Sequence, residues 1–178
     1  ATEAIACSAA VAEDRDIGNI TATPIAEENN PMRTKQITRM NNNRWAVVLG
    51  NGYNSSNQRP VLLIQYLDGA MELKRIPVTI ETAGAGKASD NGLAAPRVID
   101  INGDGLPDVA YAGDNQGNMW KFDLTSADAS NWAVALGGAP LFTATGPASL
   151  NSARSITHPI TAPPTVRAND RTMTIGTG

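Results

Sequence analysis

The sequence contains one cysteine, Cys7, and one histidine, His158. A single cysteine excludes a disulfide within these 178 residues and any cysteine-based zinc site. Cys7 is therefore either a small, partly buried residue or the partner of a cysteine outside this segment. His158 precedes a proline in an expected loop, so we expect it to be solvated rather than to bind a metal or act as a base. No Gly-x-Ser-x-Gly elbow is present to expose a nucleophilic serine.

Long apolar runs and a strong excess of either charge are also missing. No stretch approaches the roughly 20 apolar residues of a transmembrane helix. Fourteen basic and seventeen acidic residues give a formal net charge of −3, and the basic residues are scattered, so composition favours no nucleic-acid partner. Residues 1–7 lack a starting Met, a basic flank and an apolar core, so they are not a signal peptide, and we expect a mature chain or an excised piece.

Aromatic residues are scarce, at 4% of the chain, whereas 16 glycines and 11 prolines are spread along its length. The hydrophobic fraction of 42% is enough for a packed core, in which aliphatic and small side chains must do most of the filling. The few large rings at Trp45, Trp120 and Phe122 are expected to anchor that core. The many glycines and prolines predict short elements joined by frequent turns.

Period-two alternation predicts strands, and helical periodicity is weak throughout the chain. The expected strands are residues 36–40, 45–49, 61–66, 72–78, 97–99, 109–112, 118–124, 132–136 and 141–144. The pair Asp68-Gly69 predicts a hairpin turn, and residues 79–91 read as a loop. Alternation within 118–124 places Trp120, Phe122 and Leu124 on one face of their strand.

Three units repeat along the chain, each with a proline-containing opening and a later strand that ends in glycine. The openings are Thr23-Pro24-Ile25, Ala95-Pro96-Arg97-Val98 and Pro163-Pro164-Thr165-Val166, and the strands are residues 46–50, 109–113 and 172–176. Successive openings lie about seventy residues apart, whereas a four-stranded propeller blade needs about 40–45. Each unit is therefore expected to be one blade with a long insertion.

This repeat predicts an all-β fold that is part of a modified β-propeller built from antiparallel four-stranded blades. We assign residues 16–178 to the partial propeller, with repeat units opening near 23, 95 and 163, and leave residues 1–15 as an N-terminal segment outside it. Two and a half units cannot close a ring that usually has about four to eight blades. We therefore expect the chain to be a fragment of a larger propeller.

One loop concentrates oxygen side chains of the kind that bind calcium. Its residues at positions 1, 3, 5 and 9 are Asp100, Asn102, Asp104 and Asp108, a glycine stands at position 6 for the sharp turn, and position 7 offers the Leu106 carbonyl. Three carboxylates this close together repel one another, and a divalent cation converts the repulsion into a stabilising interaction. The spacing predicts one bound Ca²⁺ as the cofactor of this chain.

The loop departs from the helix-loop-helix calcium site in two respects. Position 12 is Tyr111 instead of a bidentate Glu, and the flanking segments are expected strands, so the loop is not a helical calcium sensor. We expect Asp108 to bind directly in place of the missing Glu. Mg²⁺ fits less well, because it prefers fewer protein ligands and stricter octahedral geometry. The alternative is a polar turn whose Asp and Asn side chains cap their own backbone.

Three segments occur in an order that resembles the C-terminal domain of the PilY/PilC family of type IV pilus tip-associated adhesins. They are residues 44–56, 100–114 and 117–124, and the similarity extends over roughly 16–178. The resemblance implies a modified β-propeller at the pilus tip or outer-membrane surface of a Gram-negative bacterium. It also implies calcium-dependent control of pilus extension and retraction, a role in adhesion, and the same loop residues as the family's calcium ligands.

A non-enzymatic, calcium-binding surface module is the function expected from these observations. By resemblance, its partners are minor pilins or other pilus-tip components and host-surface ligands, although the family's N-terminal adhesive region is not in this sequence. One alternative is a quinoprotein-like propeller dehydrogenase, whose blades also carry Gly-Asp-x-x-Gly turns before an aromatic strand and whose cofactor uses calcium. The ligands of such a quinone site, however, come from several blades, whereas the ligands expected here lie in one loop. Another alternative is a carbohydrate-binding or host-protein-binding propeller.

Overall fold

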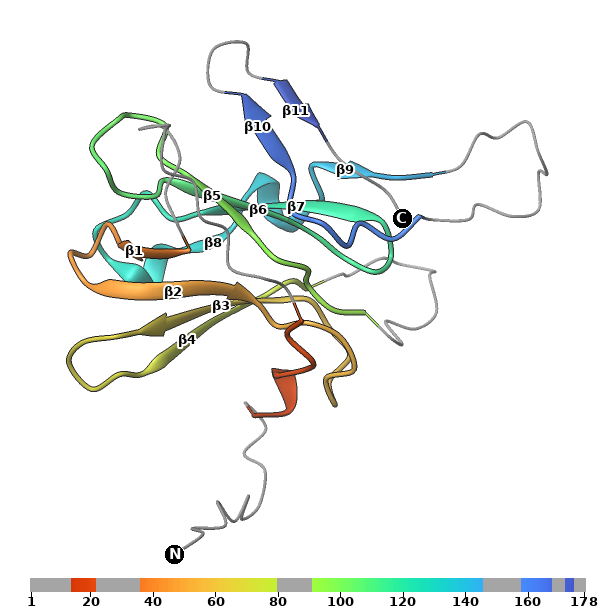
Figure 1. Ribbon diagram of the computed structural model, residues 1–178, viewed down its shortest axis with the longest axis horizontal. Helices are drawn as coiled ribbons and strands as arrows, with labels where there is room; N and C mark the ends of the chain where they lie inside the picture. The colour runs from red at the N-terminus through yellow and green to blue at the C-terminus, as the bar shows by residue number, and fades with distance from the viewer. Residues whose placement is uncertain (1–13, 22–35, 80–90, 146–157, 168–171, 175–178) are drawn as a thin grey trace, which may run out of the picture.

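Two antiparallel β-sheets make up most of the computed structural model, which describes residues 14–21, 36–79, 91–145, 158–167 and 172–174 (Figure 1). The first sheet has the strand order β1-β2-β3-β4, and the second has the order β5-β6-β7-β8 with β9 also paired to β7. A separate hairpin joins β10 to β11. Cys7, the opening at residues 23–25 and most of the expected loop 79–91 lie outside the described residues.

The strands follow the alternation of the sequence closely. Their bounds are β1 Ile37–Arg39, β2 Trp45–Gly50, β3 Val61–Tyr66, β4 Leu73–Pro77, β5 Arg97–Ile99, β6 Val109–Gly113, β7 Asn118–Asp123, β8 Ala133–Val134, β9 Phe142–Thr143, β10 Thr165–Arg167 and β11 Thr172–Thr174. Each of the nine expected strands is present within about two residues at either end, the margin at which assignments ordinarily differ. The all-β prediction and the four-stranded antiparallel sheets are confirmed.

The fourth strand of the second sheet is split into two short pieces. β8 pairs with the C-terminal end of β7, through Phe122 and Asp123, and β9 pairs with its N-terminal end, through Asn118 and Met119. Three-residue 3-10 turns at Asp14–Asp16 (η1), Ala129–Asn131 (η2) and Leu136–Gly138 (η3) are the helical elements of the described ranges. None of them has the length and apolar character that a membrane-crossing helix requires.

The main hydrophobic core lies between the two sheets. The first sheet contributes side chains such as Val48, Leu62 and Ile64, and the second contributes Trp120 and Phe122, all at most 1% exposed. Leu124 is also fully buried in this core, so the predicted common face of residues 120, 122 and 124 is confirmed. Burial of large aliphatic and aromatic side chains contributes about 1.5–3 kcal/mol each, so packing of sheet on sheet stabilises the fold.

The second sheet is also covered on its opposite face. Met119, which alternates with Trp120 on β7, packs with Ala144 and Ile160, and Tyr111 lies against this smaller cluster. The buried Arg97 donates from Nε to the carbonyl of Pro164, 3.1 Å away, in the third unit. The middle unit is thus packed between its neighbours in the sequence, as a propeller blade is.

The glycines that end the repeated strands have a packing role that explains their recurrence. Gly50 ends β2 and Gly113 ends β6, and in both places the residues just before the opening of the next unit cross close to the glycine. A Cβ at Gly50 would clash with the carbonyl oxygen of Ala94, and one at Gly113 would clash with Ile160. Absence of a side chain is therefore required where one unit passes into the next.

One expected core residue is not in the core. Trp45 is 52% exposed, so its assignment as a core anchor is wrong. It alternates with the buried Ala46 and Val48 on β2, and its side chain consequently lies on the face of the first sheet that points away from the second. His158 is exposed, as expected of a solvated residue.

The segment 14–21 is fastened to the loop that follows β2. Asp16 is 1% exposed and accepts two hydrogen bonds from the Arg59 guanidinium, at 2.8 and 2.6 Å, and one from Asn57 at 2.7 Å. Burial alone would raise the pKa of Asp16, but the hydrogen bonds from Arg59 and Asn57 outweigh it and hold the pKa below its usual value. Gly18 also donates to the Asn51 carbonyl. The predicted domain start at residue 16 stays a prediction, although Asp16 itself is tied into the fold.

Candidate metal centre

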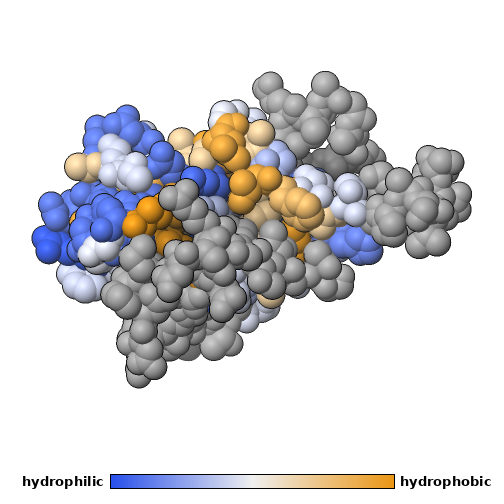
Figure 2. Space-filling model, turned by 90° about the horizontal axis from the view of Figure 1, so that it is seen from above, coloured by the Kyte–Doolittle hydropathy of each residue, from blue (hydrophilic) through white to orange (hydrophobic). Residues whose placement is uncertain are grey.

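The acidic loop joins β5 to β6 and is closed by a backbone hydrogen bond from Asp108 to Ile99 of 2.9 Å. Gly105 has φ = +86° and Gly103 has φ = +83°, in the left-handed region that glycine adopts without steric cost. The prediction that the glycine at position 6 makes a sharp turn is therefore confirmed. The loop lies at the end of the molecule where the β1–β2 and β3–β4 turns also lie, and that end is largely hydrophilic at its surface (Figures 1 and 2).

Asp100 is the organising side chain of the loop. It is fully buried, and its two oxygens accept hydrogen bonds from the backbone N–H groups of Gly103 and Gly105, each 2.7 Å away. Both donors belong to the glycines with positive φ, so the carboxylate stabilises the turn conformation that these glycines permit. A carboxylate oxygen has two lone pairs, and each oxygen of Asp100 therefore keeps one for another ligand.

Asp108 holds the start of the loop from the other side. One of its oxygens accepts from the N–H groups of Ile101 and Asn102, at 2.7 and 3.2 Å, and the side chain is 5% exposed. Its other oxygen makes no hydrogen bond within the described residues. No basic side chain in the described ranges forms an ion pair with Asp100 or Asp108. Two negative charges are therefore buried in one loop. Their hydrogen-bond donors among the described residues are backbone N–H groups.

The two remaining side-chain ligands of the prediction are exposed and contact each other. Asn102 Nδ2 donates to Asp104 at 3.1 Å, the Asp104 backbone N–H donates to Asn102 Oδ1 at 2.9 Å, and the Leu106 N–H donates to Asp104 at 2.8 Å. The Leu106 carbonyl accepts no hydrogen bond in the described part of the chain. The loop thus contains the side-chain-to-backbone capping that the alternative reading anticipates.

The chemistry of these donors fits a hard divalent cation, although the ligands do not converge as a finished site. All five groups are oxygens, the preferred ligands of Ca²⁺, and the two buried carboxylates lack a compensating cation among the described side chains. No group of three or more His, Cys, Asp or Glu side chains stands close enough to hold a metal in the described ranges. The exposed Asp104 would have to turn toward Asp100 and Asp108, and the hydrogen bonds of its side chain in the described part of the chain come from within the loop itself. The ligand set therefore stays a prediction.

Another buried carboxylate, Asp114, was not singled out from the sequence. It is fully buried just after β6 and accepts five hydrogen bonds of 2.8–3.1 Å, from the backbone N–H groups of Gln116 and Asn118 and from the side chains of Asn91, Asn118 and Trp120. Its backbone carbonyl accepts from Ile160 of the third unit at 2.9 Å. Asp114 thus joins the turn before β7, the indole of the core and the next unit.

The equivalent position in the first unit is Asn51, which follows Gly50 as Asp114 follows Gly113. Asn51 is also fully buried, accepts from Val61 and Leu93, and donates to the carbonyls of Asp16 and Arg59. A polar residue directly after the glycine that ends each repeated strand is a signal that the sequence contains. It marks a structural junction between units, not a metal site.

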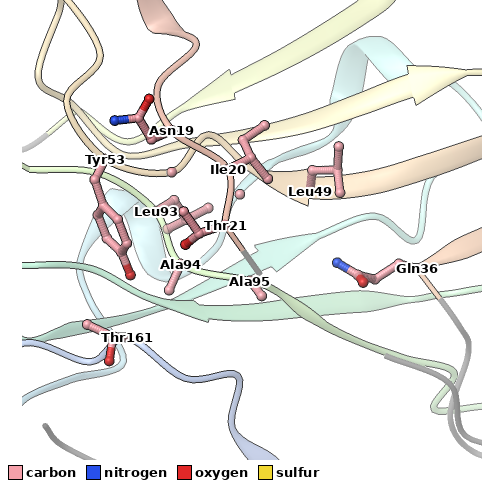
Figure 3. A pocket seen from close by; sticks show the side chains of 12 residues that line it. Asn19, Ile20, Thr21, Gln36, Leu49, Tyr53, Leu93, Ala94, Ala95 and Thr161 are labelled. Atoms are coloured by element: carbon pink, nitrogen blue, oxygen red, sulfur yellow. The ribbon is translucent and has the colours of Figure 1, made fainter. Parts of the chain in front are cut away.

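A pocket lies away from the acidic loop, where the three units approach one another (Figure 3). It is lined by Asn19, Ile20, Thr21, Gln36, Leu49, Gly50, Gly52, Tyr53, Leu93, Ala94, Ala95 and Thr161. None of these residues is acidic, basic, cysteine or histidine. Burial raises the pKa of the Tyr53 hydroxyl above its ordinary value. The described lining residues therefore offer neutral polar and aliphatic groups, and none of them carries the charge that general acid–base catalysis ordinarily uses.

Comparison with known proteins places these features in one family. The family model described as "PilY1 beta-propeller domain" matches residues 11–178. The type IV pilus biogenesis factor PilY1 of Pseudomonas aeruginosa (strain PAO1) is 39% identical over 137 residues, which cover 68% of this chain and 11% of that protein. A type IV pilus biogenesis factor PilY1 homolog of Xylella fastidiosa is 40% identical over 120 residues, covering 62% of this chain and 8% of that one.

A solved structure shows the same fold. The crystal structure of the Pseudomonas aeruginosa PilY1 C-terminal domain superposes with a TM-score of 0.69 and 34% sequence identity, covering 93% of this chain and 34% of that chain. The chain thus spans about a tenth of the length of the curated relatives it matches and about a third of the solved domain. The prediction of a partial β-propeller is confirmed by both comparisons.

Proposed function

Because this chain belongs to the PilY1 β-propeller family, we propose that it is a non-enzymatic, calcium-binding surface module of a type IV pilus biogenesis protein. The observation that supports this most strongly is the pair of buried carboxylates, Asp100 and Asp108, in a loop of oxygen ligands. No basic side chain among the described residues forms an ion pair with either of them. A charge buried without a compensating partner is costly, and a bound dication would remove that cost.

In this proposal the ion is held by the side chains of Asp100, Asn102, Asp104 and Asp108 and by the Leu106 carbonyl. A bound Ca²⁺ supplies positive charge and six to eight coordination positions at flexible geometry. The chain's own residues hold the shape of the loop. Asp100 keeps the two glycines in their left-handed turns, and Asp108 holds the N–H groups at the start of the loop, so the ends of β5 and β6 are fixed relative to each other.

The non-enzymatic part of the proposal is supported by the placement of the chemistry. All five proposed ligands come from nine consecutive residues of one loop, whereas a catalytic quinone site would gather ligands from several blades. The pocket of Figure 3 lies elsewhere and is lined by uncharged side chains. These features favour a structural or regulatory ion over a catalytic one.

The biological setting is proposed from the relatives. We place the module at the pilus tip or the outer-membrane surface of a Gram-negative bacterium, where calcium binding would control pilus extension and retraction and adhesion. Minor pilins or other pilus-tip components, and host-surface ligands, are the proposed partners. The relatives are named for type IV pilus biogenesis, which supports the pilus association.

Calcium is expected to raise the melting temperature of the protein, and Asp104→Ala is expected to abolish that rise. A ligand present at 100 times its Kd stabilises the folded state by about 2.7 kcal/mol, which corresponds to roughly 5–10 °C for a domain of this size. Extracellular calcium modules have Kd values of about 10⁻⁴–10⁻³ M, so ~10 mM calcium is about 10–100 times Kd, and thermal unfolding compared in that buffer and in chelator should differ by roughly 3–10 °C. Asp104 is exposed and its contacts lie within the loop, so the metal-free variant should melt like the metal-free wild type.

A matched control for this experiment is Asp128→Ala. Asp128 is also an exposed carboxylate of the second unit, and it accepts hydrogen bonds from the backbone and hydroxyl of Ser130 outside the acidic loop. This control should keep the full calcium-dependent rise. A wild-type protein whose melting temperature is the same in calcium and in chelator would refute the proposed site.

A further inference from the structure

The turn between β1 and β2 is joined to the acidic loop of the other sheet by one side chain, Asn41. Its Nδ2 donates to the carbonyl of Pro107 at 2.8 Å and to the carbonyl of Leu124 at 2.9 Å. A side-chain amide nitrogen carries two hydrogens, so both are used on carbonyls of the second unit, just before β6 and just after β7. The partners are 66 and 83 residues away in the sequence, which makes this a tertiary contact between two repeat units.

The Pro107 carbonyl lies between two of the proposed ligands, the Leu106 carbonyl and the Asp108 carboxylate. It belongs to the peptide group that links Pro107 to Asp108, and the N–H of the same peptide group donates to Ile99 at 2.9 Å. Because a peptide group is planar, holding its oxygen and its nitrogen fixes the orientation of the whole plane. Asn41 therefore helps to set the direction in which both neighbouring ligands project.

The same contacts form a closed ring of hydrogen bonds. Leu124 donates from its N–H to the Asp108 carbonyl at 2.9 Å, and its own carbonyl accepts from Asn41. The Leu124 side chain is fully buried in the core between the sheets. A shift of the peptide group at Pro107 would consequently break a bond to the first sheet and disturb a residue that is packed in the core.

The first sheet presents Asn41 from a fixed turn. The preceding residue, Met40, is fully buried in the main core, and its N–H donates to the Arg44 carbonyl at 2.8 Å. Asn43 donates back to the Met40 carbonyl at 2.8 Å and adopts a left-handed φ of +64°. These bonds hold the turn in one conformation, and the buried Met40 anchors the turn to the core.

We propose that Asn41 is a latch that couples cation binding in the acidic loop to the packing of the first sheet on the second. This inference rests on the calcium site proposed above. The side chain of Asn41 donates to backbone carbonyls, and it acts as a positioning residue through the peptide group that precedes Asp108. Coupling of this kind is reciprocal: if the latch strengthens calcium binding, bound calcium strengthens the contact between the two sheets by the same factor. Calcium binding in the acidic loop would then strengthen the contact of that loop with the adjacent unit.

The latch is tested by calcium titration calorimetry on the intact protein with Asn41→Ala and a control, Asn42→Ala. Outer partners of metal ligands are worth about 10–100-fold in metal affinity, and we expect Asn41→Ala to weaken calcium binding roughly 10-fold. Asn42 stands in the same turn but donates to the Tyr66 hydroxyl of its own sheet at 2.8 Å. Asn42→Ala should therefore disturb the turn while leaving calcium affinity within about twofold of wild type.

The outcomes separate the latch from the calcium site itself. A wild-type protein that binds no calcium overturns both. A wild-type protein that binds calcium, with Asn41→Ala of equal affinity, overturns the latch and leaves the site intact. Equal weakening in Asn41→Ala and Asn42→Ala also overturns the latch, because it would assign the effect to general loosening of the turn.

Hydrogen exchange of the wild-type protein provides a second test that does not depend on a folded variant. Calcium is expected to slow exchange at the amides of Asp108 and Leu124, and also at the amides of Met40 and Asn43 in the turn of the first sheet. Slower exchange in the loop with no change at Met40 and Asn43 would overturn the latch, because binding would then be confined to the second sheet.

Discussion

Replacing Asp114 by alanine is expected to lower the free energy of unfolding by about 4 kcal/mol, a large part of the 5–15 kcal/mol that stabilises a typical domain. The carboxylate is fully buried and accepts five hydrogen bonds, three of them from the side chains of Asn91, Asn118 and Trp120. Hydrogen bonds to a charged group contribute about 1.5–3 kcal/mol each, and donors left unsatisfied in the interior carry a further cost. Water that enters the vacated space would recover part of the loss.

Asp114→Asn distinguishes the contributions of the two oxygens of this carboxylate. The amide keeps an oxygen for the backbone N–H groups of Gln116 and Asn118, but its NH₂ group would face the three side-chain donors. An intermediate loss of about 2 kcal/mol is expected. The measurement is urea unfolding of the wild type and both variants, since the midpoint shift at constant slope gives the change in stability.

The control for this series is Asp123→Ala. Asp123 ends β7, is exposed, and accepts from the backbone and hydroxyl of Thr125. Surface changes of this kind usually stay within about 0.5 kcal/mol. If the free energy of unfolding of Asp114→Ala lies within about 1 kcal/mol of the wild-type value, then the junction between units does not depend on the buried carboxylate.

Asp100→Ala is the second change with a large expected effect, because it removes a proposed ligand and the buried cap of two glycines together. Calcium affinity should fall about 100-fold or more, given that even outer partners of metal ligands are worth 10–100-fold. The metal-free variant should also lose about 2–3 kcal/mol, since the N–H groups of Gly103 and Gly105 lose their 2.7 Å acceptors. Calorimetry measures the first effect, and urea unfolding in chelator measures the second.

Comparison with Asp104→Ala tells these two roles apart. Both variants should lose calcium binding, but only the change at the buried Asp100 should destabilise the metal-free protein. Unchanged calcium affinity in Asp100→Ala would contradict its role as a ligand. Unchanged stability of its metal-free form would instead contradict its role as the organiser of the loop.

The fold was largely predictable because its signals are local. Alternation located the strands from β1 to β9, and the recurring glycines at Gly50 and Gly113 marked the ends of equivalent strands. What alternation does not reveal is which face of a sheet another sheet covers. Trp45 was misassigned for this reason, since it lies on the face of β2 opposite to the core.

The candidate site was predictable in its composition and less so in its contacts. The spacing of the acidic loop identifies the oxygen ligands and the glycine turn. It does not show which carboxylate oxygens accept hydrogen bonds from backbone N–H groups and which are free to bind a metal. The role of Asn41 could not be predicted from the sequence, because its partners at Pro107 and Leu124 are distant along the chain. The partners are also backbone carbonyls, which every residue has. Asp114 carried a weak signal, through its equivalence with Asn51.

The central claim, that the acidic loop holds calcium, is tested most directly by a high-resolution crystal structure of this protein grown in excess calcium. We expect one ion with the oxygens of Asp100, Asn102, Asp104 and Asp108 and the Leu106 carbonyl around it at about 2.3–2.6 Å. Density that shows these side chains bound to backbone N–H groups or directed into solvent, with no ion among them, would contradict the account.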